Sequence, residues 1–192
     1  VSEECAARRE AHREGIVHRD LKPANIYAAE RGGGYDVTKL LDFGLSRPNE
    51  AREVVSASSD PATANLPLTT QGAFIGTVPY MSPEQITSGE IDQRTDIFAL
   101  GTVLYEMATG QRLFGGTNSA LIFSAIMQFS PNSLSRIGRE LPRPLATIIR
   151  RCLQKNPADR YAHAGELLAE LRRLRNWIRD EALPKLTSII ER

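Results

Sequence analysis

The residues from 18 to 25, His-Arg-Asp-Leu-Lys-Pro-Ala-Asn, constrain this chain more than any other stretch of its sequence. They place a carboxylate (Asp20), an amine (Lys22) and a carboxamide (Asn25) on one short segment, and the carboxylate of Asp42 follows in an Asp-Phe-Gly triplet. Asp20 is a candidate general base, and Lys22 is a point charge suited to a phosphate. Asn25 and Asp42 carry oxygen ligands of the kind that Mg²⁺ takes. The set predicts phosphoryl transfer.

Two short runs, 26–28 and 35–41, lie on either side of three consecutive glycines. Glycine supplies the positive φ of a tight reversal, so the pattern predicts a β-hairpin. The glycines could instead cradle a phosphate, but they lack the spacing of a phosphate-binding loop. A hairpin would have Asn25 at one end and Asp42 at the other, and would bring these two predicted metal ligands together.

Helical patterns occupy much of the remaining chain. We expect helices over 2–14, from Asp96 through Met107 with an end at Gly110, over 118–129, over 144–154, and from about 164 to 178. The last of these interleaves leucines with arginines. A basic amphipathic helix can lie on a membrane, but acidic residues share this one, and we interpret it as a packed helix with a solvated face.

Composition excludes several classes of protein. The 192 residues carry 24 Lys and Arg against 23 Asp and Glu, which argues against nucleic-acid binding by bulk charge. No run approaches the roughly 20 apolar residues of a membrane span. Cys5 and Cys152 are far apart and without metal-ligand spacing, so a disulfide framework is not expected. We expect a cytoplasmic chain, or the cytoplasmic domain of a membrane-anchored parent.

The motifs, taken in order, resemble the C-terminal lobe of eukaryotic-like (Hanks-type) serine/threonine protein kinases. The sequence of residues 76–85 is most similar to that of bacterial members. The catalytic loop is followed by the Asp-Phe-Gly triplet, by Gly-Thr-Val-Pro-Tyr-Met-Ser-Pro-Glu-Gln at 76–85, and by Asp-Ile-Phe-Ala-Leu-Gly at 96–101. Ser82 stands where the family usually has Ala, and Phe98 where Trp is frequent. The resemblance covers residues 3–178. It implies a mainly α fold with a small β-hairpin beside the catalytic loop.

The resemblance also implies catalytic roles. Asp20 would orient and deprotonate a substrate hydroxyl, and Lys22 would neutralise charge on the transferred phosphoryl group. Asn25 and Asp42 would hold the Mg²⁺ that accompanies ATP. Lys22 and Thr77 together favour Ser or Thr in a protein substrate.

Regulatory and structural roles are implied in the same way. Arg19 would help to form a basic pocket for a phosphate on Thr69 or Thr70 of the activation segment. His18 would pack under Phe43 rather than act as a base. The resemblance also implies an ion pair between Glu84 and Arg160. Asp96 would hold the backbone of the catalytic loop.

The implied domain is residues 1–180, with the catalytic loop at 18–25, the activation segment at 42–84 and a tail at 181–192. The chain starts at Val1, and no glycine-rich loop or nucleotide-binding lysine motif precedes the catalytic loop. We therefore expect a C-lobe whose N-lobe is absent, inactive in isolation. Two alternatives remain: a pseudokinase or docking module, and a small-molecule phosphotransferase of the aminoglycoside-kinase type.

Overall fold

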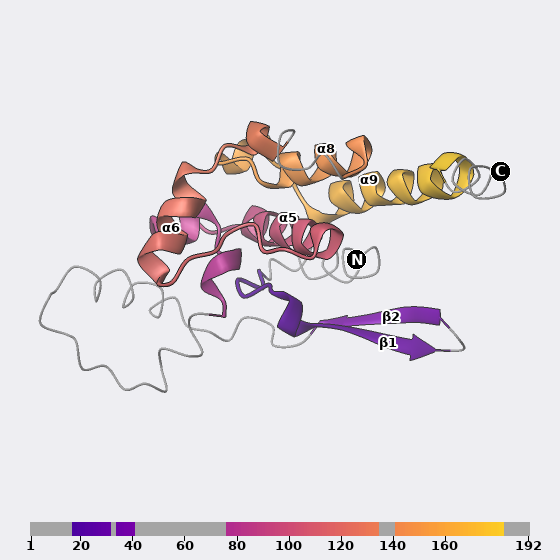
Figure 1. The fold of residues 1–192 in the computed structure, drawn as a ribbon, viewed down its shortest axis with the longest axis horizontal. Coiled ribbons are helices and arrows are strands. Elements are labelled where there is room, and N and C mark those ends of the chain that lie inside the picture. Colours follow the sequence, from indigo (N-terminus) through magenta and orange to yellow (C-terminus); the bar gives the residue numbers. More distant parts are fainter. Residues whose placement is uncertain (1–16, 32–33, 41–75, 135–140, 183–192) are drawn as a thin grey trace, which may run out of the picture.

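The computed structural model describes residues 17–31, 34–40, 76–134 and 141–182. A two-stranded hairpin lies beside a body of helices (Figure 1), so the predicted fold class is confirmed. The predicted helix at 2–14 lies outside the described residues. So do the glycine turn at 32–33 and the Ser- and Thr-containing segment up to residue 75.

The hairpin consists of β1 (Ile26–Arg31) and β2 (Gly34–Leu40), paired antiparallel. Ile26 lies opposite Leu40, and a bulge falls between Ala29 and Glu30. The predicted hairpin is confirmed, but β1 runs three residues further than the predicted run at 26–28. The extra residues are paired through their backbones, and the backbone ladder does not depend on side-chain polarity.

The long helix α5 (Gln93–Thr109) begins three residues before the predicted start at Asp96. Asp92 caps it, because its Oδ1 accepts from the backbone N–H of Arg94 at 2.7 Å. The predicted start was therefore wrong, and Asp96 stands in the first turn. The predicted end is confirmed: Gly110 terminates the helix with φ 69°, a left-handed conformation that glycine adopts without a steric penalty.

The other helices are α4 (Pro83–Ile86), α6 (Ser119–Gln128), α8 (Arg143–Cys152) and α9 (Ala164–Trp177), which continues into a π-helical turn at Ile178–Ala182. Short 3₁₀ turns occur at Pro23–Asn25, Val78–Tyr80, Pro131–Ser133 and Pro157–Asp159. The helices predicted at 118–129 and from 164 are confirmed, whereas α8 ends two residues before the predicted Gln154.

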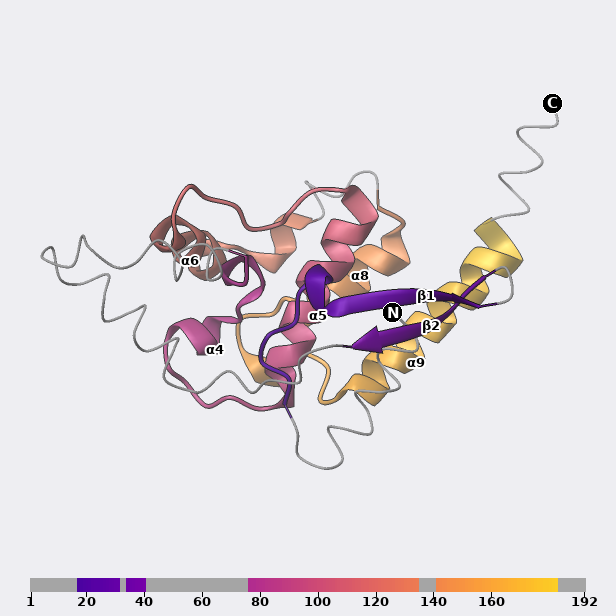
Figure 2. The ribbon, with the colours of Figure 1, turned by 90° about the horizontal axis from the view of Figure 1, so that it is seen from below.

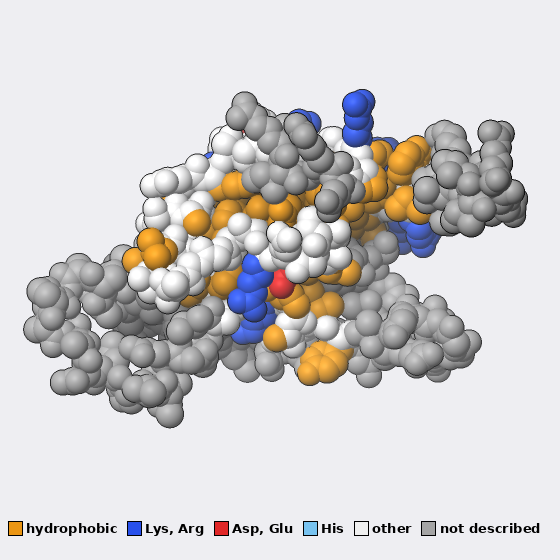
Figure 3. Space-filling model, viewed as in Figure 1, with side chains coloured by type: hydrophobic (Ala, Val, Ile, Leu, Met, Phe, Trp, Pro, Cys, Tyr) orange, Lys and Arg blue, Asp and Glu red, His pale blue; other side chains and the backbone are white. Residues whose placement is uncertain are grey.

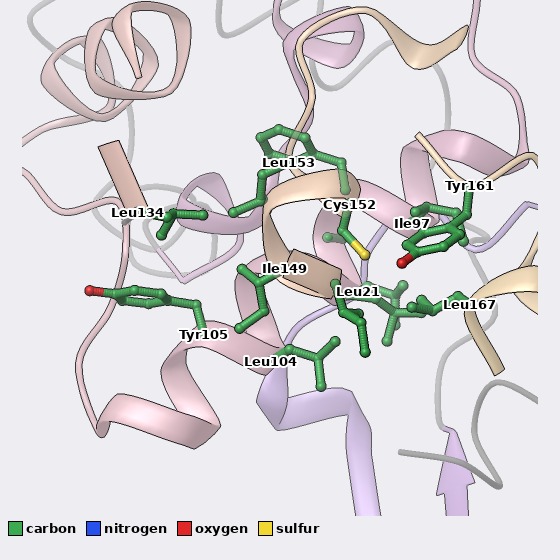
Figure 4. Close-up of a cluster of buried hydrophobic side chains, with 14 of the residues drawn as sticks. Leu21, Ile97, Leu104, Tyr105, Leu134, Ile149, Cys152, Leu153, Tyr161 and Leu167 are labelled. Atoms are coloured by element: carbon green, nitrogen blue, oxygen red, sulfur yellow. The ribbon is translucent and has the colours of Figure 1, made fainter. Parts of the chain in front are cut away.

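The core forms around α5, which lies between the hairpin and the helices α8 and α9 (Figures 1 and 2). Its residues 95–105 are buried, so it has no solvated face along this stretch. Leu21, from the catalytic loop, is 2% exposed and lies among core side chains such as Ile149 and Leu167 (Figure 4). The catalytic loop is thus anchored in the core by the residue between Asp20 and Lys22.

Helix α5 packs closely against the end of α8 at Gly101. A Cβ added to Gly101 would lie 2.6 Å from the Cβ of Cys152 and 3.2 Å from atoms of Leu153. Only glycine permits this approach, because real Cβ atoms do not come so close to another carbon. The contact fixes the position of α5 against α8.

The surface of α6 differs from that of the other helices. Residues 113–135 contain no charged side chain, and Leu121 and Met127 are exposed. In the space-filling view the described part of α6 accordingly carries apolar and neutral polar atoms (Figure 3). Among the described residues, no helix combines the length and apolarity needed to cross a membrane.

Candidate active site

Asp20 stands at the centre of the catalytic loop's polar contacts. Its Oδ2 accepts from the Nζ of Lys22 at 2.9 Å and from the Nδ2 of Asn25 at 3.1 Å. Its Oδ1 is buried and has no hydrogen-bond partner among the described residues. A buried carboxylate oxygen left in this way costs free energy unless a ligand pairs with it. One oxygen is therefore held by the loop, and the other can receive a proton donor from outside.

The backbone of this loop is held by Asp96 from the first turn of α5. The carboxylate accepts from the N–H of His18 at 2.9 Å and from the N–H of Arg19 at 3.0 Å. Asp96 is 1% exposed, and its two oxygens pair with donors 77 and 78 positions away. These two hydrogen bonds join the first turn of α5 to the backbone directly before Asp20.

His18 is 1% exposed, and its Nδ1 accepts from the backbone N–H of Asp20 at 3.3 Å. Both observations fit a structural histidine better than a base that meets a substrate. Phe43, the predicted packing partner of His18, lies outside the described residues.

Arg19 adopts φ 66°, in the left-handed region where a side chain is strained. Such a conformation costs of order 1–2 kcal/mol in a residue other than glycine. It persists because the backbone is held on both sides: the N–H donates to Asp96, and the C=O accepts from the Nε2 of Gln85 at 2.9 Å. The strain lies directly before Asp20, and strain of this kind clusters at active sites.

Lys22 connects the catalytic loop to the end of the activation segment. Its Nζ donates to Asp20 Oδ2 and to the Oγ1 of Thr77, both at 2.9 Å. The contact with Thr77 joins residues 55 positions apart in sequence. A cation at this place can neutralise charge that develops on a transferred group beside Asp20.

Asn25 is positioned by local geometry. Pro23 sets φ for the 3₁₀ turn at Pro23–Asn25, and Asn25 N–H donates to Lys22 C=O at 3.0 Å. The side chain is buried, and its Nδ2 also donates to the C=O of Asp20 at 2.9 Å. With the amide nitrogen committed to Asp20, the amide oxygen is the atom that would serve as a metal ligand.

Asp42, the second predicted metal ligand, lies outside the described residues, and so do Thr69 and Thr70. The pairing of Ile26 with Leu40 places the two hairpin ends beside each other, one residue after Asn25 and two residues before Asp42. The donor types, a carboxamide and a carboxylate, suit Mg²⁺.

Below the loop, Glu84 and Arg160 form a buried ion pair. The Nη1 of Arg160 lies 2.7 Å from Oε1 of Glu84, and Nη2 lies 2.8 Å from Oε2. Burial alone would raise the pKa of Glu84, but the hydrogen bonds and charge of Arg160 outweigh it and hold that pKa below its usual range. The Oγ1 of Thr95 also donates to Glu84, at 2.8 Å.

The sequence motifs did not identify Gln85 as a residue of this site, although a local pattern indicates its role as a helix cap. Ser82 followed three residues later by Gln85 is a capping-box pattern, and the box is formed at the start of α4. His163 also has a role that the sequence motifs did not indicate: it is exposed, and its Nδ1 caps α9 by accepting from Glu166 N–H at 3.3 Å.

Three comparisons place this geometry among known proteins. The family model described as the protein kinase domain matches residues 5–170. The serine/threonine-protein kinase PknB of Mycobacterium tuberculosis is 34% identical over the whole chain, which spans 28% of PknB. Kinase Pkn1 of Myxococcus xanthus is 36% identical over 84% of this chain and 22% of its own length.

The fold comparison agrees with the sequence comparisons. The crystal structure of Rad53 1–466 in complex with AMP-PNP superposes with a TM-score of 0.61 over 88% of this chain and 37% of that chain, at 24% identity. At this identity the likeness concerns the fold alone. The chain spans less than a third of the length of these curated relatives.

Proposed function

Since this chain belongs to the protein kinase family, with relatives named as bacterial serine/threonine-protein kinases, we propose that it forms the larger catalytic lobe of such an enzyme. The reaction is transfer of the γ-phosphoryl group of ATP to a Ser or Thr hydroxyl of a protein substrate. The lobe acts in the cytoplasm together with a nucleotide-binding N-lobe.

The observation that carries this proposal is that the two carboxylate oxygens of Asp20 differ in their hydrogen bonds. Oδ2 accepts from both Lys22 and Asn25, which restrains the position of this oxygen. Oδ1 is buried and without a partner among the described residues, so a substrate hydroxyl would satisfy it. Asp20 would orient this hydroxyl and take its proton late in the transfer.

The other residues support the same reaction. Lys22 lies within hydrogen-bonding distance of Asp20 and would meet the transferred phosphoryl group as a positive charge. Asn25 and Asp42 would hold the Mg²⁺ of the nucleotide, which neutralises phosphate charge when bound. Arg19 would attract a phosphate on Thr69 or Thr70 and so couple modification of the activation segment to the loop.

The alternatives are less favoured. A pseudokinase would have no need of the Asp20, Lys22 and Asn25 arrangement. A small-molecule phosphotransferase would not need the platform in which Thr77, Glu84 and Arg160 are tied to the catalytic loop and to α5. The relatives reported above are named as protein kinases, which also favours a protein substrate.

Replacement of Asp20 by Asn in the full-length natural protein tests the assignment. Transfer of labelled phosphate to a protein substrate should fall by at least about 10²-fold, because the amide cannot accept the proton. The melting temperature should remain close to that of the unsubstituted protein, since Asn keeps the shape of the side chain. An unchanged transfer rate would refute the base role.

The 192-residue polypeptide assayed alone should be nearly inactive. Phosphoryl transfer depends on positioning of the nucleotide, and the sequence contains no glycine-rich loop or nucleotide-binding lysine motif ahead of the catalytic loop. Turnover by this polypeptide within the usual range of about 1–100 s⁻¹ would contradict the proposal that an N-lobe is required.

A further inference from the structure

We propose that Gln85 is a positioning residue for catalysis, which holds the strained backbone before Asp20 through its hydrogen bond to Arg19. The inference rests on the proposed kinase function and adds a residue to it. Gln85 belongs to α4, directly after the expected activation segment at 42–84, and lies 66 positions from Arg19 in sequence.

The argument begins with the peptide groups of Arg19 and Asp20. The N–H of Arg19 donates to Asp96, the N–H of Asp20 donates to His18 Nδ1, and the C=O of Asp20 accepts from Asn25. The remaining group, the C=O of Arg19, accepts from Gln85 at 2.9 Å. Each of these four groups is therefore bound by a side chain, and among these side chains only that of Gln85 comes from α4.

The conformation of Arg19 makes this last contact important. With φ at 66°, Arg19 would relax towards an ordinary backbone conformation if one of its two tethers were removed. Rotation about the peptide that joins Arg19 to Asp20 would change the direction of the Asp20 carboxylate. A shift of about 1 Å at a reacting group costs catalysis heavily.

The carboxamide of Gln85 is itself fixed from the other side. Its Oε1 accepts from the N–H of Ser82 at 3.0 Å and lies 3.3 Å from the Ser82 hydroxyl, while the backbone N–H of Gln85 donates to Ser82 Oγ at 3.4 Å. One end of the carboxamide caps α4 and the other end holds the catalytic loop. The carboxamide of Gln85 thus contacts both the start of α4 and the backbone beside Asp20.

A simpler interpretation is that Gln85 only caps a short helix, and two substitutions separate the two roles. Gln85→Glu keeps an oxygen for Ser82 N–H and retains a residue type favoured in a capping box, but it has no N–H for Arg19. Ser82→Ala removes the capping hydroxyl, leaves the Gln85 to Arg19 contact in place, and introduces the residue that the kinase family usually has here.

The experiment measures kinetics and backbone hydrogen exchange in the full-length natural protein. For Gln85→Glu we expect kcat to fall about tenfold, with the KM for ATP little changed, and exchange of the peptide covering residues 18–22 to become faster. Ser82→Ala should retain kcat and the exchange rate of that peptide. Gln85→Met, which lacks both polar ends and adds no charge, should behave as Gln85→Glu does.

The outcomes separate the two proposals. Equal effects of Gln85→Glu and Ser82→Ala on kcat and exchange would overturn the positioning role and leave only the cap. An effect of Gln85→Glu that Gln85→Met does not share would overturn it as well, because the added charge would be the cause. If Gln85→Glu speeds exchange of residues 18–22 but the unsubstituted full-length protein has no kinase activity, the hydrogen bond from Gln85 to Arg19 would still be shown to hold this backbone. The proposed kinase function would then be refuted.

Discussion

Arg160 donates from both terminal nitrogens to the carboxylate of Glu84, and every N–H of its guanidinium finds an acceptor. The Nε donates to Gln154 C=O at 2.7 Å, while Nη1 and Nη2 also reach the carbonyls of Arg94 and Lys155 at 2.9 and 3.1 Å. The side chain of Arg160 is 0% exposed, and its Cζ lies 5.0 Å from the ring centre of Phe98. This residue joins α4, α5 and the loop after α8.

Removal of one partner of this pair should destabilise the fold strongly. Arg160→Met leaves the buried charge of Glu84 unpaired, and we expect a loss of about 3–5 kcal/mol in the free energy of unfolding. Urea denaturation of the two proteins measures it. The control is Glu170→Gln, which breaks the exposed pair of Glu170 with Arg173 and should cost less than about 1 kcal/mol. Similar losses in both variants would contradict the role assigned to burial.

The same pair should make stability depend on acid pH. Because the pKa of Glu84 is lower in the folded protein than in the unfolded chain, the unfolded chain binds the proton first as pH falls. The contribution of ionised Glu84 to the free energy of unfolding is complete above the pKa of Glu in the unfolded chain, about 4.3. It is lost as the pH decreases through the pKa of Glu84 in the folded protein. Denaturation measured between pH 6 and pH 3 should show that the free energy of unfolding decreases more steeply with falling pH in the unsubstituted protein than in Glu84→Gln. The same decrease in both proteins would exclude Glu84 as the cause of the pH dependence.

Thr77 should affect catalysis through Lys22. Thr77→Val keeps the shape of the side chain but removes the acceptor for Lys22 Nζ, and we expect the phosphoryl-transfer rate of the full-length protein to fall about tenfold. Thr77→Ser should recover most of the loss, since it restores the hydroxyl. The matched control, Thr147→Val, removes a hydroxyl on the exposed surface of α8, where Oγ1 donates to Arg143 C=O. A loss of rate in this control would mean that the assay detects general instability.

Gly101→Ala should destabilise the protein although alanine is the better helix former. The added methyl group would lie 2.6 Å from Cys152 Cβ, so α5 and α8 must separate. We expect a net loss of about 1–3 kcal/mol, more than the roughly 1 kcal/mol that helix propensity returns. Gly115→Ala serves as a control, because no atom lies within 4 Å of the position of its Cβ. Thermal denaturation that leaves Gly101→Ala as stable as the control would show that the helices adjust freely.

Local patterns were sufficient for much of this structure. The hairpin, the glycine at the end of α5 and the start of α9 each depend on a few neighbouring residues, and each was predicted. The start of α5 was missed because Asp92 and Asp96 are both acceptable caps, and only the tertiary fold determines that Asp96 faces the catalytic loop.

The contacts that were not predicted join segments far apart in sequence. The capping box of Ser82 and Gln85 can be recognised in four residues, but the hydrogen bond from Gln85 to Arg19 depends on how α4 packs beside the loop. The left-handed backbone of Arg19 has no local sequence signal, since arginine rarely adopts it. The predicted convergence of Asn25 and Asp42 on a metal ion stays a prediction, because Asp42 lies outside the described residues.

The close contact of Gly101 with Cys152 limits how such a protein could be switched on and off. Because there is no room for a side chain at position 101, α5 packs directly against Cys152, and the same helix carries Asp96, which binds the backbone of the loop at 18–25. In the proposed kinase, we would therefore expect regulation at segments joined by single polar contacts, such as the contact of Thr77 with Lys22 and that of Gln85 with Arg19. Activation would then consist of forming or breaking a few hydrogen bonds around the loop at 18–25, while the packing of α5 against α8 stays unchanged.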